Sequence, residues 1–325
     1  MNDKKATSPF ELNHFLPGVE YFRSEVISGL QKPQKELPSK YFYDVKGARL
    51  FERICTLDEY YIPGSEADIM DACKDEVVEV IGPHVYLLEY GSGDCTKVCF
   101  LLDNLDELVA YAPIDISEEQ LSCVSRQLHS NYPGVEVLPV CADYTNTFEL
   151  PVPRRPYNRR VVFFPGSTIS NFDPLPARNF LKNIAGICRP NGGLLIGVDL
   201  KKDPTILHRA YNDSKRVTAA FNLNLLERIN RELQGDFKLD AFEHYAFYNH
   251  RESRIEMHLV SRCEQIVRVG KTTISFAKGE SIWTESSYKY NIDEFAQIAD
   301  TVGFRVERVW TDEQNWFSIQ YLSTT

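Results

Sequence analysis

Long apolar runs and basic blocks are both missing from this sequence of 325 residues. No run approaches the roughly 18 apolar residues that a membrane-spanning helix needs, and the N-terminus is polar where a signal peptide has an apolar core. The 36 basic residues stand against 46 acidic ones, for a formal net charge of −10. Because nucleic-acid-binding proteins present a basic face, this balance argues against a polyanionic partner. We expect a soluble, cytoplasmic monomer with no membrane or nucleic-acid partner.

Paired cysteine motifs are also absent, since none of the eight cysteines forms a C-x-x-C pair. Several cysteines lie within apolar runs, which favours reduced and buried thiols over a disulfide framework. Cys95 and Cys99 could share a helical face. No paired histidine motif accompanies them, so we expect no metal site.

A Gly-x-Gly turn follows an apolar run at Val85–Gly93, and a segment with helical periodicity comes next. Glycines let the backbone approach a ligand, and the N–H groups at the start of a helix face it. Asp115 ends a second apolar run about 20 positions later, where an acidic residue commonly holds a ribose diol. Together these features predict a site for an adenosine-type cofactor, although a glycine turn alone can simply join a strand to a helix.

The same loop distinguishes between cofactors. A dinucleotide fingerprint has a third glycine where this chain has Thr96, and Lys97 is the only basic residue near two acidic ones, Glu89 and Asp94. Such a loop is a poor cradle for a pyrophosphate. It suits the sulfonium and ammonium groups of S-adenosylmethionine, so we favour that cofactor over a nicotinamide or flavin nucleotide.

Alternating strands and helices continue beyond this turn. Ser117, with Gln120 three positions on, predicts a helix with a capping box. Further strands are expected at 135–140, 160–164 and 194–199, and a helix at 177–188. This alternation predicts an open parallel sheet with its ligands at the carboxyl ends of the strands. The fold class expected is α/β, with a Rossmann-like methyltransferase sheet.

Residues 200–286 interrupt this alternation. Apolar residues recur every four positions from Val217 to Leu233, which predicts a long amphipathic helix, and mixed strands follow over 241–274. A helix from 292 and two β-rich runs at 304–310 and 316–322 then resemble a closing antiparallel hairpin. We therefore expect a core at 65–200 and 287–325, and an α+β substrate-binding domain built from 1–64 and 201–286.

Short motifs spread over nearly the whole chain resemble the histidine Nα-methyltransferases of ergothioneine biosynthesis. They occur in the family's order and begin with Tyr41-Phe42-Tyr43-Asp44 and Leu57-Asp58-Glu59-Tyr60-Tyr61. The others are Phe164–Asn171, Arg209-Ala210-Tyr211, 217–222, 230–233, 240–244, Arg254-Ile255-Glu256-Met257 and Thr284-Glu285-Ser286-Ser287. This sequence departs only mildly from the family pattern. It has Gly64-Ser65 in place of a more basic pair and Tyr144 in place of a phenylalanine, and Pro165 and Ser170 alter the loop before Asn171.

The resemblance implies a role for each matching position. It implies Gly91, Lys97, Asp115, Asp143 and Tyr144 around S-adenosylmethionine, the last two beside the adenine. Tyr43 and Asn171 would be catalytic, with Tyr43 near the reacting amine. The other implied substrate residues are Tyr60, Gly166, Tyr211, Met257, Glu285 and Ser287, with Asn171 and Tyr211 on the carboxylate and Tyr60, Glu285 and Ser287 on the imidazole.

The activity implied is three methyl transfers to the α-amine of L-histidine, giving its betaine as the first step of ergothioneine biosynthesis. Two alternatives stay open: another amino acid or small amine as the substrate, and a non-catalytic cofactor-binding protein. A nucleic-acid methyltransferase is disfavoured by the charge and by the missing Asp/Asn-Pro-Pro-aromatic motif. His244 and His258 each stand alone in an alternating run, which favours a structural role.

Overall fold

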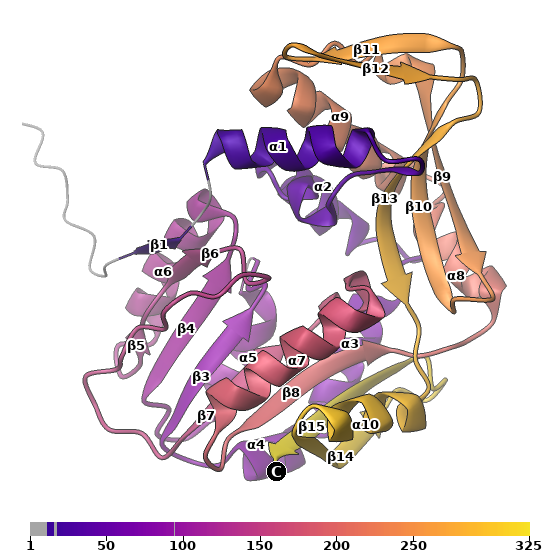
Figure 1. Ribbon diagram of the computed structural model, residues 1–325. Coiled ribbons are helices and arrows are strands. Elements are labelled where there is room, and N and C mark those ends of the chain that lie inside the picture. Colours follow the sequence, from indigo (N-terminus) through magenta and orange to yellow (C-terminus); the bar gives the residue numbers. More distant parts are fainter. Residues whose placement is uncertain (1–11, 16–17, 94) are drawn as a thin grey trace, which may run out of the picture.

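A twisted, mostly parallel sheet forms the lower half of the computed structural model, which describes residues 12–15, 18–93 and 95–325 (Figure 1). In the described chain the strand order is β1-β6-β4-β3-β7-β8-β15-β14, with β5 beside β4. Among the described strands of this sheet only β15 runs in the opposite direction, antiparallel to both β8 and β14. The strands are β1 (Asn13–Phe15), β3 (Val85–Tyr90), β4 (Ala110–Asp115), β5 (Glu136–Val137), β6 (Val140–Ala142), β7 (Arg159–Phe164), β8 (Gly193–Asp199), β14 (Phe304–Thr311) and β15 (Phe317–Thr324).

Helices cover both faces of this sheet. Side chains of β3 alternate between the two faces: Tyr86 and Leu88 pack in one apolar cluster, Val85 and Leu87 in the other. The first cluster is covered by α7 (Pro174–Cys188) and α10 (Ile292–Thr301). The second is covered by α3 (Ile62–Ala72), α4 (Lys74–Ile81), α5 (Thr96–Asn104) and α6 (Glu118–Asn131). The predicted Rossmann-like α/β sheet is therefore confirmed.

Some local predictions were wrong. The strand expected at 135–140 is split into β5 and β6, because Pro139 between them has no N–H to donate to a continuous ladder. Ser117 does precede α6, but its side chain makes no capping bond, and its backbone N–H donates to Asp115 Oδ1 at 2.9 Å. The antiparallel hairpin expected at the C-terminal end is confirmed as β14 and β15.

A second body of structure lies above the carboxyl ends of the strands (Figure 1). It contains a four-stranded sheet, in the order β2-β13-β10-β9, and the hairpin β11–β12. The long helix predicted from Val217 is confirmed as α9 (Val217–Leu233). The other elements are α1 (Val19–Leu30), β2 (Lys35–Glu36), η1 (Ser39–Phe42), α2 (Val45–Ile54), α8 (Pro204–Tyr211), η3 (Leu239–Ala241), β9 (Phe242–Asn249), β10 (Arg254–Ser261), β11 (Gln265–Val269), β12 (Thr272–Phe276) and β13 (Ser281–Tyr288). The short helix η2 (Thr168–Asn171) follows β7 in the lower body, where its Ile169 is buried.

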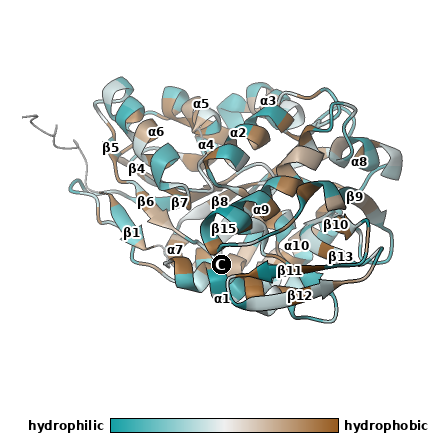
Figure 2. Ribbon diagram, turned by 90° about the horizontal axis from the view of Figure 1, so that it is seen from above, coloured by the Kyte–Doolittle hydropathy of each residue, from teal (hydrophilic) through white to brown (hydrophobic). Residues whose placement is uncertain are grey.

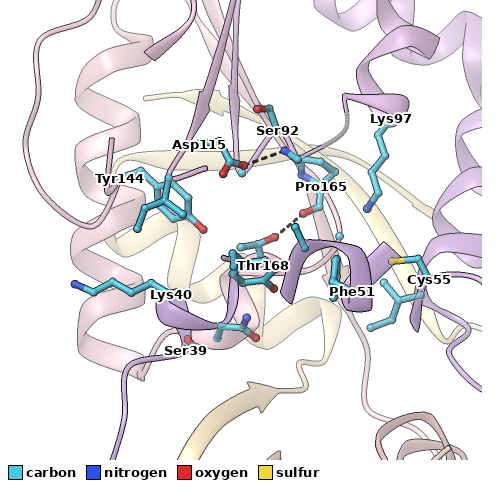
Figure 3. A pocket seen from close by; sticks show the side chains of 18 of the residues that line it. Ser39, Lys40, Phe51, Cys55, Ser92, Lys97, Asp115, Tyr144, Pro165 and Thr168 are labelled. Atoms are coloured by element: carbon cyan, nitrogen blue, oxygen red, sulfur yellow. Dashed lines mark hydrogen bonds between the residues drawn. The ribbon is translucent and has the colours of Figure 1, made fainter. Parts of the chain in front are cut away.

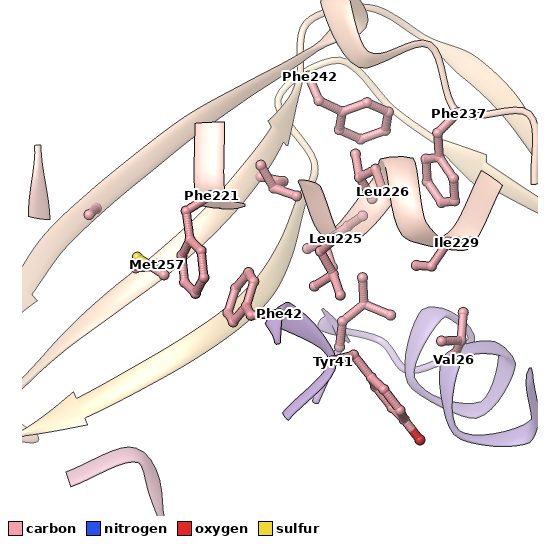
Figure 4. Packing of buried hydrophobic residues seen from close by; sticks show 14 of the residues in the cluster. Val26, Tyr41, Phe42, Phe221, Leu225, Leu226, Ile229, Phe237, Phe242 and Met257 are labelled. Carbon is pink, nitrogen blue, oxygen red and sulfur yellow. The ribbon is translucent and has the colours of Figure 1, made fainter. Parts of the chain in front are cut away.

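One apolar cluster holds this upper body together (Figure 4). Leu225, Leu226 and Ile229 of α9 are fully buried in it. Phe42, which follows α1 in the chain, stacks on Phe221 with ring centroids 4.5 Å apart. The segment 19–57 thus packs on the inserted residues, as expected, whereas β1 pairs with β6 at the edge of the larger sheet.

Strand β13 connects the two bodies. It starts in the upper sheet and descends toward α10, so that Ile282 packs in the upper cluster and Tyr288 in a lower one (Figure 1). Apolar and polar residues are interspersed along the helices in the view from above (Figure 2). Within the described residues, no helix has both the length and the apolar character that crossing a bilayer requires.

Candidate active site

A cavity of about 980 Å³ opens between the larger sheet and the upper body, at the carboxyl ends of the strands (Figure 3). Its lining is acidic: in the described chain, nine carboxylate side chains and two lysines face it. The lysines are Lys40 and Lys97, and the carboxylates are Glu36, Glu52, Glu66, Asp71, Glu89, Asp115, Asp143, Asp173 and Glu285. Such a lining suits a cationic ligand and repels a pyrophosphate.

The glycine turn and Asp115 meet at one end of this cavity, as the sequence predicts. Gly91 and Gly93 adopt φ values of +72° and +52°, a left-handed conformation that glycine adopts at little cost. Gly93 N–H donates to Asp115 Oδ2 at 2.9 Å (Figure 3). Burial raises the pKa of Asp115, and its backbone hydrogen bonds oppose that rise. The carboxylate is thereby held at the turn, with lone pairs left for a diol.

Asp143 and Tyr144 line the cavity beyond the end of β6. Tyr144 lies edge-on to Tyr90, with ring centroids 5.9 Å apart. Asp143 accepts from the backbone N–H of Thr145 at 3.0 Å and from Lys40 Nζ at 2.9 Å. Lys40 also pairs with Glu25 of α1 at 2.7 Å. This ion-pair cluster connects the edge of the larger sheet to the upper body.

Lys97 and Gly166 meet around a carboxylate that the sequence did not single out. Glu66 of α3 is buried, pairs with Lys97 Nζ at 2.5 Å and accepts from Gly166 N–H at 2.7 Å. Burial alone lowers the pKa of Lys97, but the attraction of Glu66 outweighs it and leaves that pKa raised. Lys97 is therefore cationic at the cavity wall.

A smaller recess of about 50 Å³ adjoins the large cavity. Every residue that the family resemblance implies for the substrate lines it: Tyr43, Tyr60, Gly166, Asn171, Tyr211, Met257, Glu285 and Ser287. Several of these, including Tyr43, Asn171 and Glu285, also line the large cavity. The structure thus brings together residues from six separate stretches of the chain, with the cofactor residues close by.

Three tyrosines line the recess: Tyr43, Tyr60 and Tyr211. Tyr60 and Tyr211 lie edge to face at 6.2 Å, and Tyr43 lies edge-on to Phe51 at 5.6 Å. Burial raises the pKa of Tyr43 and of Tyr60 well above the ordinary value. Both phenols therefore keep their protons at neutral pH, and neither is a strong base.

Glu285 and Ser287 come from the same face of β13. Burial raises the pKa of Glu285 to about 7, although the nearby Lys289 opposes the rise. Tyr211 O–H donates to Ser287 Oγ at 2.7 Å. Lys289 Nζ lies 2.6 Å from the same oxygen and 2.7 Å from Asp199 Oδ2.

Metal ligands do not gather in the described residues: no group of three His, Cys, Asp or Glu side chains could hold an ion. Cys95 Sγ contacts Tyr111 Oη at 3.4 Å, while Cys99 Sγ donates to Cys95 O. Neither His244 nor His258 lines the large cavity or the recess. His244 bonds to Asn222 and to the backbone oxygen of Tyr211, and His258 bonds to Ser281 and Glu256.

Four residues with close contacts to the site were not predicted: Lys40, Glu66, Asp199 and Lys289. Each meets a partner across the fold, for instance Lys40 and Asp143, which lie 103 positions apart in the chain. No local motif marks such long-range pairs. Lys289 offers the one useful signal: it stands between Tyr288 and Tyr290, and a lysine that is buried with such neighbours has to find a partner.

Comparison with known proteins assigns this architecture to a family. A family described as histidine-specific, S-adenosylmethionine-dependent methyltransferases matches residues 22–324. This chain belongs to that family. It is 42% identical to the histidine N-alpha-methyltransferase of Mycobacterium tuberculosis, with 91% of this chain and 93% of that protein aligned.

Two further relatives agree. The histidine N-alpha-methyltransferase of Mycolicibacterium smegmatis is 40% identical over 93% of this chain and 94% of its own length. Ergothioneine biosynthesis protein 1 of Neurospora crassa is 28% identical over 90% of this chain, which spans 34% of that longer protein. A histidine-specific methyltransferase of this family requires S-adenosylmethionine.

The cavity fits that cofactor. Asp115 offers acceptors for ribose hydroxyls, Lys97 a cation for a carboxylate, and Glu66 an acceptor for an ammonium group. In the described chain only two lysines line the cavity, and each lies beside a carboxylate, so the lining has too little positive charge to balance a diphosphate. The chemistry of the lining therefore favours S-adenosylmethionine over a dinucleotide.

Proposed function

We propose that this protein transfers three methyl groups from S-adenosylmethionine to the α-amine of free L-histidine. The product is histidine betaine, and the reaction is the first step of ergothioneine biosynthesis. The observation that carries the proposal is a recess, lined by Tyr60, Glu285 and Ser287, that adjoins the acidic cofactor cavity in a chain of the histidine-specific family. An imidazole has two nitrogens, which match polar groups on two sides of such a recess.

We assign the cofactor to Gly91, Lys97, Asp115, Asp143 and Tyr144. In this assignment Asp115 accepts hydrogen bonds from the ribose, while Asp143 and Tyr144 take the adenine. Lys97, held by Glu66, takes the carboxylate of the methionine portion, and the acidic lining attracts its ammonium group. S-adenosylmethionine supplies an electrophilic methyl group when it is bound.

We assign the substrate to the walls shared by the two cavities. Tyr43 orients the reacting amine, and Asn171 holds the carboxylate. Tyr211 is assigned to the carboxylate as well, and its hydroxyl bond to Ser287 connects it to the ring-binding residues. Gly166 and Met257 shape the walls of the recess.

The proposed chemistry needs positioning more than a base. A free α-amine has a pKa of about 7.7–8.0, so a neutral fraction exists near pH 7. The neutral amine would take the methyl group by in-line displacement from the sulfonium, which keeps the electron pair of the broken carbon–sulfur bond. After the first and second transfers the amine proton would pass to solvent. Tyr43 stays protonated, so its oxygen can accept an amine N–H without placing a second cation nearby. The third transfer gives a quaternary nitrogen and ends the sequence.

We further propose that residues 65–200 and 287–325 form the methyltransferase core, and that 1–64 and 201–286 form the substrate-binding part, with β1 as an edge strand beside the core. The enzyme would act as a monomer in the cytoplasm and without a metal. Light scattering with size-exclusion chromatography and activity in the presence of a chelator test the oligomeric state and the metal independence.

The main test incubates the purified protein with labelled S-adenosylmethionine and a panel of free amino acids, read by mass spectrometry. We expect histidine to gain one, two and three methyl groups in succession. Methylation of another amino acid but not of histidine would overturn the substrate assignment. The absence of any transfer, with the cofactor still bound, would favour a non-catalytic protein instead.

A further inference from the structure

Lys289 is a fully buried lysine immediately after β13, and the chemistry described above does not use it. Its ammonium group lies 2.6 Å from Ser287 Oγ, 2.7 Å from Asp199 Oδ2 and 3.4 Å from Tyr211 Oη. Two of these three partners, Ser287 and Tyr211, line the recess. Lys289 therefore connects the recess to a charge at the end of β8.

The positive charge of Lys289 is secured by its surroundings. Burial alone lowers the pKa of Lys289, but the Asp199 carboxylate outweighs this effect and leaves the pKa raised. Asp199 is itself held by Lys202 and by Tyr61 O–H at 2.8 Å. Removing Lys289 would thus still leave Asp199 with two partners.

The hydrogen bonds that Ser287 accepts determine where its own proton can point. An ammonium group only donates, whereas a serine hydroxyl has one proton to donate and room to accept two hydrogen bonds. Ser287 Oγ accepts from Lys289 at 2.6 Å and from Tyr211 O–H at 2.7 Å. Both acceptor positions are then used, and the proton of Ser287 has to point elsewhere. The recess is the open space that Ser287 faces.

We propose that Lys289 is a positioning residue that determines substrate specificity. Together with Tyr211 it orients Ser287 so that the serine O–H points into the recess. The recess then selects a ring that has a nitrogen with a lone pair. Glu285, two residues earlier on β13, supplies the complementary acceptor for a ring N–H. One donor and one acceptor side by side match the neutral form of an imidazole. This inference rests on the proposed histidine substrate and adds which hydrogen bonds in the recess recognise the ring.

Three substrates with different rings test the direction of this hydrogen bond. Histidine has both a lone-pair nitrogen and an N–H, β-(thiazol-4-yl)-L-alanine keeps only the lone pair at the Nδ1 position, and β-(pyrrol-3-yl)-L-alanine keeps only the N–H at the Nε2 position. For Lys289→Met we expect kcat/KM to fall roughly 5- to 150-fold for histidine and for the thiazole, the range for a lost buried hydrogen bond. The pyrrole should change by less than about twofold, and KM for S-adenosylmethionine should stay constant.

Lys202→Met is the matched control, because Lys202 also pairs with Asp199 but has no contact with Ser287. It should leave the preference among the three rings unchanged. The double variant Asp199→Asn/Lys289→Met removes both buried charges together, in case the single change does not fold, and should show the same ring-selective loss. Equal losses for all three rings would mean that Lys289 is merely structural and would overturn the proposal.

Ser287→Ala supplies a measurement that does not depend on replacing a buried charge. If Ser287 donates, its removal penalises histidine and the thiazole but spares the pyrrole. A selective loss for the pyrrole would mean that Ser287 accepts, and the proposed direction would be wrong. Failure of the unsubstituted protein to methylate histidine is a separate outcome, which would overturn the proposed function.

Discussion

At the scale of single residues, the ionised carboxylate of Glu285 should favour histidine binding but lower the stability of the folded protein. Its carboxylate faces the recess, and burial raises its pKa from 4.5 to about 7. The folded state therefore binds the proton more tightly than the unfolded state does. By linkage, ionising this group destabilises the fold, and the loss develops as the pH rises from about 4.5 through 7.

Glu285→Gln should consequently stabilise the protein at pH 8 by on the order of 1–3 kcal/mol and have little effect at pH 4.5. The same change should lower kcat/KM for histidine, because an amide cannot supply the same charged acceptor. Chemical denaturation at the two pH values gives the free energies of unfolding. A stability gain that is equal at both pH values would contradict the assigned cause.

Asp115 gives a second residue-scale prediction. Asp115→Ala should weaken cofactor binding by roughly 1–3 kcal/mol through loss of charge-assisted hydrogen bonds to the ribose. The fold should change less, because the side chain faces a cavity and its partners there are the backbone N–H groups of Gly93 and Ser117. Calorimetry with S-adenosylhomocysteine measures the effect. Unchanged affinity in a folded variant would remove Asp115 from the site.

At the scale of elements, the segment η1–α2 places Tyr43 through a tight turn. The side chain of Asp44 accepts from Gly47 N–H at 2.7 Å and from Asn224 of α9 at 2.7 Å. A Cβ on Gly47 would come within 1.7 Å of Phe42 O, a backbone atom that has little room to move. The start of α2 is therefore fixed by a position that tolerates only glycine.

Gly47→Ala should destabilise the protein by on the order of 2–4 kcal/mol and raise KM for histidine, because the turn that carries Tyr43 must shift. Gly64→Ala is the matched control within α3. A Cβ at Gly64 meets nothing within 4 Å, so this change should stabilise the helix by up to about 1 kcal/mol. Denaturation of the two variants side by side decides the matter, and similar stabilities would show that the turn can adjust.

Elements with strong periodic patterns were predictable from the sequence, and long-range contacts were not. Continuous apolar runs identify the buried strands β3, β7 and β8. Apolar residues spaced four positions apart identify the helix α9. The split at Pro139 was missed because the apolar pattern runs through it. At the site, the family motifs pointed to residues that do line the cavities. Glu66 carries no local pattern, and the partners of both Glu66 and Lys289 are set by packing between distant parts of the chain.

At the scale of the whole molecule, the two cavities lie where the lower sheet and the upper body meet. The stretch 36–56 of the upper body lines the large cavity opposite the glycine turn of the larger sheet. A ligand that fills both cavities therefore contacts both bodies at once. Elements such as α4 and the hairpin β11–β12 contribute no lining residue to either cavity.

This arrangement predicts where ligands should slow amide hydrogen exchange. S-adenosylhomocysteine alone should protect the turn around Gly91 and the start of α5, since it occupies the sheet side of the cavity. Adding histidine should extend the protection to 39–54 and to β13, whose residues line the shared recess. Ligand contacts suppress the local openings through which buried amides exchange, so the effect should concentrate in these segments. The segments 74–81 and 265–276 serve as internal controls and should exchange at unchanged rates. Protection spread evenly over the chain would indicate global stabilisation only. If protection stayed confined to the sheet side after histidine is added, the substrate would not bridge the two bodies.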